Sequence, residues 1–154
     1  MCGILTTLAL IFSYVETLVP LNVSIPGIKL GLANLVIVFA LIKLDVASAT
    51  TIAALRVILV GFLFGGLSGI IYSLAGMVCS LLVMVTALAY SRFHLITVSI
   101  FGALAHIIGQ LIVAACIVGA GPIIGYAPFC MLAALISGAV IGIVDSEILK
   151  RVFV

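Results

Sequence analysis

Six runs of apolar residues, separated by short clusters of polar residues, glycine and proline, divide this sequence. An α-helix rises about 1.5 Å per residue, so roughly 20 apolar residues are needed to cross the hydrocarbon core of a bilayer. Most runs approach that length, and the second is short for a full span. The predicted helices are residues 2–19, 30–44, 46–64, 70–90, 95–118 and 129–144. The pattern predicts an all-α, polytopic membrane protein with six transmembrane helices, in which residues 1–154 form a single domain.

Glycine, proline and charged residues mark where these helices are expected to end. Glycines at residues 65–69 separate the third run from the fourth. The stretch from Gly119 to Pro128 is expected to be irregular, because proline cannot continue a helix and glycine permits turns. The polar tail that begins at Asp145 is expected to leave the membrane.

The composition excludes a soluble domain and a nucleic-acid-binding protein. Hydrophobic residues make up 67% of the chain and charged residues 6%, too few to cover a soluble surface. The six basic residues are scattered and form no tract suited to a nucleic acid. The four cysteines lie far apart, so we expect neither disulfides nor a metal site, and no cofactor.

The basic residues predict the orientation in the membrane. Counting six spans, one side holds four of them and the other side holds only Lys29, since Arg56 lies within a span. Cytoplasmic loops of membrane proteins carry an excess of lysine and arginine. We therefore expect both termini in the cytoplasm, on the side of Lys43, Arg92, Lys150 and Arg151.

Polar side chains within the predicted spans point to a binding site. An ionisable group in a span costs at least about 2.5 kcal/mol on insertion scales, so such groups usually face a cavity or a partner. The topology places them in the centre or outer half of the membrane. With residues of the connecting segments and two tyrosines, they are expected to bind substrate in a pocket that opens away from the cytoplasm. The predicted substrate-binding residues are Glu16, Lys29, Asn34, Arg56, Tyr72, His106, Gln110 and Tyr126.

A second interpretation needs no ligand. Glu16 and Arg56 would neutralise each other, while Asn34, His106 and Gln110 would hydrogen-bond between helices. Clustering of these groups away from the cytoplasmic half favours the pocket, because interhelical bonding alone has no preferred depth. A proton relay is less favoured, since no acidic residue is expected deep in the cytoplasmic half.

Small residues recur at helical spacing on several predicted helices. Ala9 and Ser13 are four residues apart on the first, and Ala134, Gly138 and Gly142 follow the same spacing on the last. Such residues let helix backbones approach closely. They serve either packing within the chain or docking of another membrane protein.

Three sequence blocks, in order, carry a resemblance that extends from about residue 8 to residue 144. The blocks are Ile-Pro-Gly-Ile-Lys-Leu-Gly-Leu-Ala-Asn at 25–34, Leu-Arg-Val at 55–57 with Phe-Gly-Gly at 64–66, and Gly-Ala-Leu-Ala-His at 102–106 with Gly-Gln-Leu at 109–111. The chain resembles the Gx transporter family, commonly labelled heptaprenyl diphosphate synthase component I. That family is similar in turn to the substrate-binding S components of energy-coupling factor (ECF) transporters.

The resemblance implies a multi-pass protein of the bacterial plasma membrane with both termini cytoplasmic and a ligand pocket near the outer face. It also implies that the first helix docks on a transmembrane coupling subunit, here through Ala9 and Ser13. The synthase label does not fit a catalytic subunit, because prenyl diphosphate synthesis needs aspartate-rich motifs for magnesium and this chain has only Asp45 and Asp145. We therefore do not expect an enzyme.

The leading hypothesis is a membrane subunit that captures a small molecule from the outer face. No phosphate-binding loop motif is present, so ATPase subunits and a coupling subunit would drive uptake. The alternative is a non-catalytic membrane subunit associated with prenyl diphosphate or quinone synthesis, or with a membrane redox system. A third possibility is a stand-alone proton-coupled carrier.

Overall fold

The computed structural model describes residues 1–18, 32–90 and 93–152. These residues form six α-helices and one short π-helix, with no strand among them. The elements are α1 (Cys2–Leu18), α2 (Leu32–Lys43), α3 (Val46–Val60), the π-helix η1 (Gly61–Gly65), α4 (Gly66–Ala89), α5 (Leu95–Val118) and α6 (Ala120–Val152). The all-α prediction is confirmed for this part of the chain.

Four of the helical segments are long and apolar enough to cross a membrane. They are Val46–Phe64, Gly66–Ala89, Leu95–Val118 and Ala120–Arg151, and two shorter apolar helices, Cys2–Glu16 and Ala33–Lys43, accompany them. The 12 residues of α2 extend about 18 Å, less than the roughly 30 Å hydrocarbon core. The helices indicate a multi-pass membrane protein, while the count of six full spans remains a prediction.

The outer surface of the bundle supports this conclusion. Phe62, Leu67 and Ile124 are each at least 70% exposed, and many other large apolar side chains also point outward. Monomeric soluble proteins rarely expose so much contiguous apolar surface. Lipid chains are the environment that suits these side chains.

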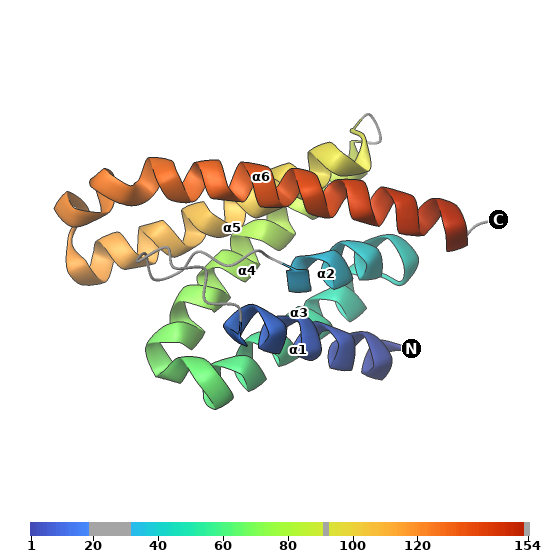
Figure 1. Ribbon diagram of the computed structural model, residues 1–154, viewed down its shortest axis with the longest axis horizontal. Helices are drawn as coiled ribbons and strands as arrows, with labels where there is room; N and C mark the ends of the chain where they lie inside the picture. Colours follow the sequence, from blue (N-terminus) through green and yellow to red (C-terminus); the bar gives the residue numbers. More distant parts are fainter. Residues whose placement is uncertain (19–31, 91–92, 153–154) are drawn as a thin grey trace.

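Both termini lie at the same end of the bundle (Figure 1). The end of α2 and the start of α3, as well as the end of α4 and the start of α5, lie toward this end, which we call the terminal end. The turns from α3 to α4 and from α5 to α6 lie at the opposite, distal end. Lys43, Lys150 and Arg151 occupy the last turns of α2 and α6, so the basic residues of the described chain concentrate at the terminal end. Which side of the membrane this end faces remains a prediction.

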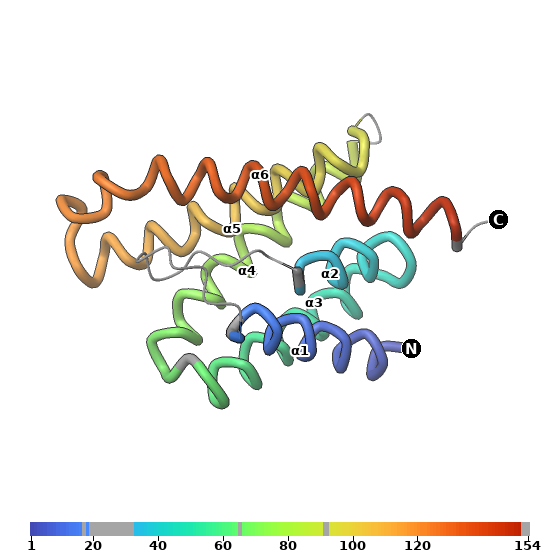
Figure 2. Tube along the Cα trace, in the orientation of Figure 1, coloured from blue at the N-terminus to red at the C-terminus, as the bar shows by residue number. Residues whose placement is uncertain are grey.

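The helices form two groups, seen in the trace of Figure 2 as α1 to α3 and α4 to α6. The contacts of α5 with α4 and α6 are the most extensive in the molecule, and α1 contacts α2 and α3. Fewer contacts join the groups, through α3 with α4 and α2 with α6. One buried cluster, including Val38, Met84 and Val98, draws on helices of both groups.

Glycine brings α6 close to α5. A Cβ atom added at Gly142 would lie 2.6 Å from Ile96 Cα, and one at Gly138 would lie 2.9 Å from Ile100 Cα. Both distances are shorter than van der Waals contact, so the two backbones pack at a separation that only glycine permits. For Gly138 and Gly142, the prediction that small residues serve packing within the chain is confirmed.

Ala9 and Ser13 are buried within the described chain. Ala9 is 0% exposed and Ser13 is 4% exposed. Ala9 packs in a cluster with Val36 of α2 and Ile52 of α3. This burial supports the packing interpretation of the two residues, and docking of a partner on α1 remains a prediction.

The last helix also differs from the prediction. An irregular stretch to Pro128 and an end at residue 144 were expected, but α6 runs without interruption from Ala120 to Val152. Gly119 separates α5 from α6, and its φ of 96° is a conformation that glycine adopts readily. Pro122 lies in the first turn, where no backbone N–H is needed, and Pro128 is accommodated inside the helix.

The continuation of α6 buries an acidic residue that was expected to leave the membrane. Asp145 is 0% exposed, and neither carboxylate oxygen has a hydrogen-bond partner. Two residues further on, Glu147 is exposed and pairs with Lys150 at 3.7 Å and Arg151 at 3.6 Å. The end of α6 therefore has a polar outer face and one buried carboxyl group.

Candidate functional site

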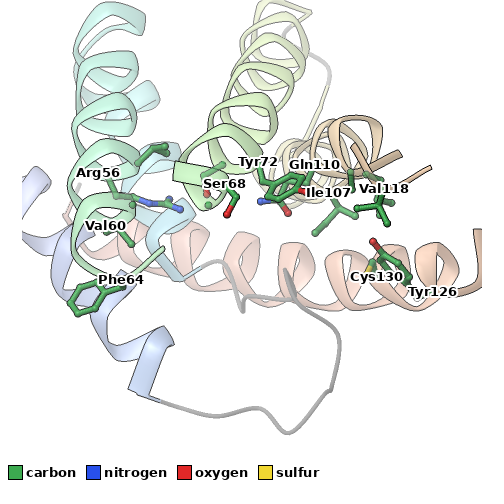
Figure 3. A pocket seen from close by; sticks show the side chains of 16 residues that line it. Arg56, Val60, Phe64, Ser68, Tyr72, Ile107, Gln110, Val118, Tyr126 and Cys130 are labelled. Atoms are coloured by element: carbon green, nitrogen blue, oxygen red, sulfur yellow. The ribbon is translucent and has the colours of Figure 1, made fainter. Parts of the chain in front are cut away.

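A cavity of about 570 Å³ lies among the distal ends of α3, α4, α5 and α6 (Figure 3). It is bounded by the last turns of α3 and α5 and by the first turns of α4 and α6, which meet at the distal end. We call it the main cavity. Its lining residues are Arg56, Val57, Val60, Gly61, Phe64, Ser68, Gly69, Tyr72, Ser73, Ile107, Gln110, Leu111, Ala114, Val118, Tyr126 and Cys130.

A smaller space of about 50 Å³ adjoins the main cavity. The two share Arg56, Ser73, Ile107, Gln110 and Cys130 in their walls. The remaining lining of the smaller space includes residues from α1 and α2, which the main cavity does not reach. We call this space the polar pocket. Its further lining residues are Glu16, Asn34, Ala103, His106, Ala133, Ala134, Ser137 and Ile141.

All but one of the predicted substrate-binding residues line these two spaces. Tyr72 and Tyr126 line the main cavity alone. Glu16, Asn34 and His106 line the polar pocket alone, and Arg56 and Gln110 line both. The remaining residue, Lys29, lies outside the described residues. The structure thus brings the predicted residues together from α1 to α6.

Arg56 occupies the junction of the two spaces. Its side chain extends from α3 toward the middle of the main cavity (Figure 3). The Glu16 carboxylate interacts with it electrostatically across the polar pocket. An opposite charge nearby lowers the cost of holding a guanidinium inside a helix bundle. This electrostatic interaction agrees with the second interpretation, and the Arg56 side chain nevertheless lines an open space.

His106 and Gln110 form a second polar pair, on α5. Gln110 Nε2 lies 3.2 Å from His106 Nε2, at the i, i+4 spacing that places both on one helix face. With the amide nitrogen as the donor, His106 Nε2 accepts, and the proton of the neutral ring is on Nδ1. Gly76 of α4 leaves room for the ring, because a Cβ there would lie 2.8 Å from His106 Nε2.

Several lining residues were not predicted from the sequence. Ser68 lies one turn before Tyr72, and Cys130 lies one turn after Tyr126, so each shares a helix face with a predicted residue. Helical spacing is the signal that could have found them. The fourth and sixth helices were expected to begin at residues 70 and 129. Ser68 and Tyr126 therefore lay outside the predicted helices, and no shared helix face could be assigned to them.

The two spaces bring several kinds of polar group together within largely apolar walls. Its described polar groups are one guanidinium, one carboxylate, two amides, one imidazole and several hydroxyls, with one buried thiol. Within the described residues, no three histidine, cysteine or acidic side chains are grouped so that they could hold a metal ion. The walls of the main cavity are otherwise apolar and aromatic, which is typical of small-molecule sites.

A model of one protein family, described as heptaprenyl diphosphate synthase component I, matches residues 5–148. The chain belongs to this family. The match confirms the family resemblance carried by the three sequence blocks. Comparison with curated proteins and with solved structures found no match. The further similarity to ECF S components remains a prediction.

In this member of the heptaprenyl diphosphate synthase component I family, the sequence blocks meet in the site. Asn34 ends the first block, Arg56 is the centre of the second, and His106 and Gln110 belong to the third. All four line the polar pocket. The residues that carry the resemblance are therefore neighbours in space, although they lie on three different helices.

Proposed function

We propose that this protein is a membrane subunit that binds a small molecule in the main cavity, as S components do, and passes it to partner subunits for uptake. The observation that carries the proposal is the cavity of about 570 Å³ with Arg56 at its junction with the polar pocket. Ligand sites typically have volumes of about 300–1,000 Å³, mostly apolar walls and a few polar groups that fix orientation. The main cavity fits that description.

The position of the cavity supports capture from outside the cell. It lies at the distal end, opposite the terminal end with its cluster of basic side chains. If the positive-inside rule holds here, the terminal end is cytoplasmic and the cavity is in the outer half. Energy would come from ATPase subunits through a coupling subunit, since the sequence contains no phosphate-binding loop of its own.

The test is ligand retention by the full chain. Protein purified in a mild detergent is analysed by native mass spectrometry, and small molecules released from it are identified. Arg56→Ala should lose the bound molecule, while Leu132→Ala, on a side chain that is 56% exposed, should retain it. Size-exclusion chromatography and thermal melting establish that both variants are folded. Full retention by a folded Arg56→Ala variant contradicts the proposal.

Family membership favours a second candidate, a non-catalytic membrane component of a prenyl diphosphate synthase. The description implies a partner component, and that partner would supply the catalytic aspartates. Purification of the tagged chain from its own host separates the two candidates. Co-elution with ATPase and coupling subunits supports uptake, and co-elution with a soluble synthase supports the second candidate.

A further inference from the structure

The charges that line the two spaces limit what can bind there. Among the described lining residues, Arg56 is the one permanent cation and Glu16 is the one carboxylate. With the His106 ring neutral, these two charges cancel, and Lys29, the other predicted cation, lies outside the described residues. An uncompensated charge in a site of low dielectric costs several kcal/mol, so a well-matched ligand should leave that balance unchanged.

The balance does not suit a diphosphate. A prenyl diphosphate would place two to three negative charges against one guanidinium, with the Glu16 carboxylate beside it. Diphosphate sites usually combine several cations or a magnesium ion held by carboxylates. No such cluster of acidic residues occurs within the described chain.

The two charges occupy different positions along the site. Arg56 lines both spaces, whereas Glu16 lines only the polar pocket, which at about 50 Å³ admits a small head group and not a whole ligand. A molecule whose body fills the main cavity therefore meets Arg56 first and Glu16 beyond it. Asn34, His106 and Gln110 surround the same small space with hydrogen-bonding groups.

The body of the ligand is defined by the main cavity. Val60, Phe64, Leu111 and Val118 supply apolar walls, and Tyr72 and Tyr126 add aromatic rings with hydroxyl groups. Figure 3 shows Tyr72 on α4 and Tyr126 on α6, with Ile107, Gln110 and Val118 of α5 in the same wall. Aromatic and aliphatic walls favour an apolar or aromatic body.

We infer that the ligand is an amphipathic zwitterion, with a carboxylate at Arg56, an ammonium group directed to Glu16 and an apolar or aromatic body in the main cavity. The inference rests on the proposed function and names its substrate class. A zwitterion supplies each charged residue with an opposite charge and leaves the sum at zero.

Four probes test the head group. Tryptophan carries both charges, indole-3-propionate lacks the ammonium group, tryptamine lacks the carboxylate, and geranyl diphosphate carries the alternative head group. Binding to the full chain in nanodiscs is measured by isothermal titration calorimetry. Tryptophan should bind roughly tenfold more tightly than either half-charged analogue, and more tightly than geranyl diphosphate.

Variants of the two charged residues assign the contacts. Glu16→Gln should weaken tryptophan binding roughly tenfold and strengthen indole-3-propionate binding, because Arg56 is left without its counter-charge. Arg56→Gln should weaken tryptophan binding and strengthen tryptamine binding, because Glu16 is left without its counter-charge. Removing one member of a buried pair leaves the other uncompensated, so a single variant can fail to fold. The double variant Glu16→Gln with Arg56→Gln removes both charges and should fold while losing the preference for tryptophan.

Several results would overturn the zwitterion inference. They are equal affinity for tryptophan and indole-3-propionate, tighter binding of geranyl diphosphate, no binding of tryptophan at millimolar concentration, or an unchanged preference in the double variant. These results leave the proposed function standing if native protein still retains a small molecule that Arg56→Ala loses. Failure of that retention experiment instead removes the proposed function, so the two failures are distinguishable.

Discussion

His106 and Gln110 are joined by a side-chain hydrogen bond of 3.2 Å on one face of α5, and the imidazole fits against the backbone of Gly76 on α4. The glycine therefore determines where the ring lies. A Cβ at this position would overlap three ring atoms, each within 2.9 Å. The shape of the polar pocket therefore depends on the absence of a Cβ atom at Gly76.

Gly76→Ala is predicted to displace the His106 ring and weaken ligand retention. Overpacking of a close contact costs about 1–3 kcal/mol, so the melting temperature should also fall. Both effects can be followed by differential scanning fluorimetry and native mass spectrometry. Gly125→Ala is the matched control, because nothing lies within 4 Å of a Cβ at that helical position. An unchanged melting temperature and full retention in Gly76→Ala would contradict the arrangement.

Asp145→Asn is predicted to stabilise the protein. The Asp145 side chain is fully buried on α6 without a hydrogen-bond partner, and burying an ionisable group that has no partner is costly. Replacing the ionisable carboxyl group should raise the free energy of unfolding by at least about 1 kcal/mol at neutral pH, measured by chemical denaturation in detergent. Glu147→Gln, on the exposed face of the same helix, should change it by less. A destabilised Asp145→Asn variant would mean that the carboxylate has a partner in the membrane.

Asp45 is predicted to make stability depend on pH at the acidic end. Its carboxylate caps α3, with Oδ2 accepting from the Ser48 backbone N–H at 3.3 Å. Hydrogen bonds from the Ser48 hydroxyl and amide hold the pKa of Asp45 below its ordinary value of 3.8. Because the folded-state pKa is the lower one, this stabilisation is complete above the ordinary value and is lost as the pH falls through the folded-state value.

The measurement compares melting temperatures of wild type and Asp45→Ala. Wild type should be the more stable at neutral pH, and the difference should disappear in strong acid. Asp45→Asn is the control, since asparagine also caps helices but has no carboxylate to titrate. A difference that persists unchanged in strong acid would exclude the charged cap as its source.

The orientation of the bundle can be tested by labelling. In a variant without native cysteines, Gly121→Cys lies at the distal end and Glu147→Cys lies at the terminal end, and both native residues are exposed. An impermeant maleimide added to intact cells should label only Gly121→Cys, because the basic terminal end is predicted to be cytoplasmic. The reverse pattern would place the main cavity on the inner side and contradict capture from outside.

Much of the polar site could be predicted because charged and amide groups are costly in a membrane and therefore gather. Glu16, Arg56 and His106 lie on three different helices, yet depth alone predicted that they would share a space. The extent of α6 could not be predicted in the same way. Pro122 and Pro128 usually mark helix ends, but the first falls in a first turn and the second is accommodated by the surrounding structure.

The small residues of α1 show another limit of prediction from the sequence. The spacing of Ala9 and Ser13 predicts close approach of another helix, but it does not say whether that helix belongs to the same chain. In the structure α1 packs against α2 and α3 of its own chain. The burial of Asp145 was missed for a related reason, because a polar sequence at a helix end does not reveal which of its side chains faces the core.

The two-group arrangement of the helices gives the main cavity a mechanical role. Arg56 projects from the group of α1 to α3, whereas Tyr72, Gln110 and Tyr126 belong to the group of α4 to α6. Under the proposed function, a ligand that contacts both groups would link them where the helices of the described chain share fewer contacts. Its binding free energy would stabilise the association of the two helix groups, and this association would be less stable when the cavity is empty. Ligand binding in the main cavity would then change the stability of the association between the two helix groups, including at positions far from the cavity.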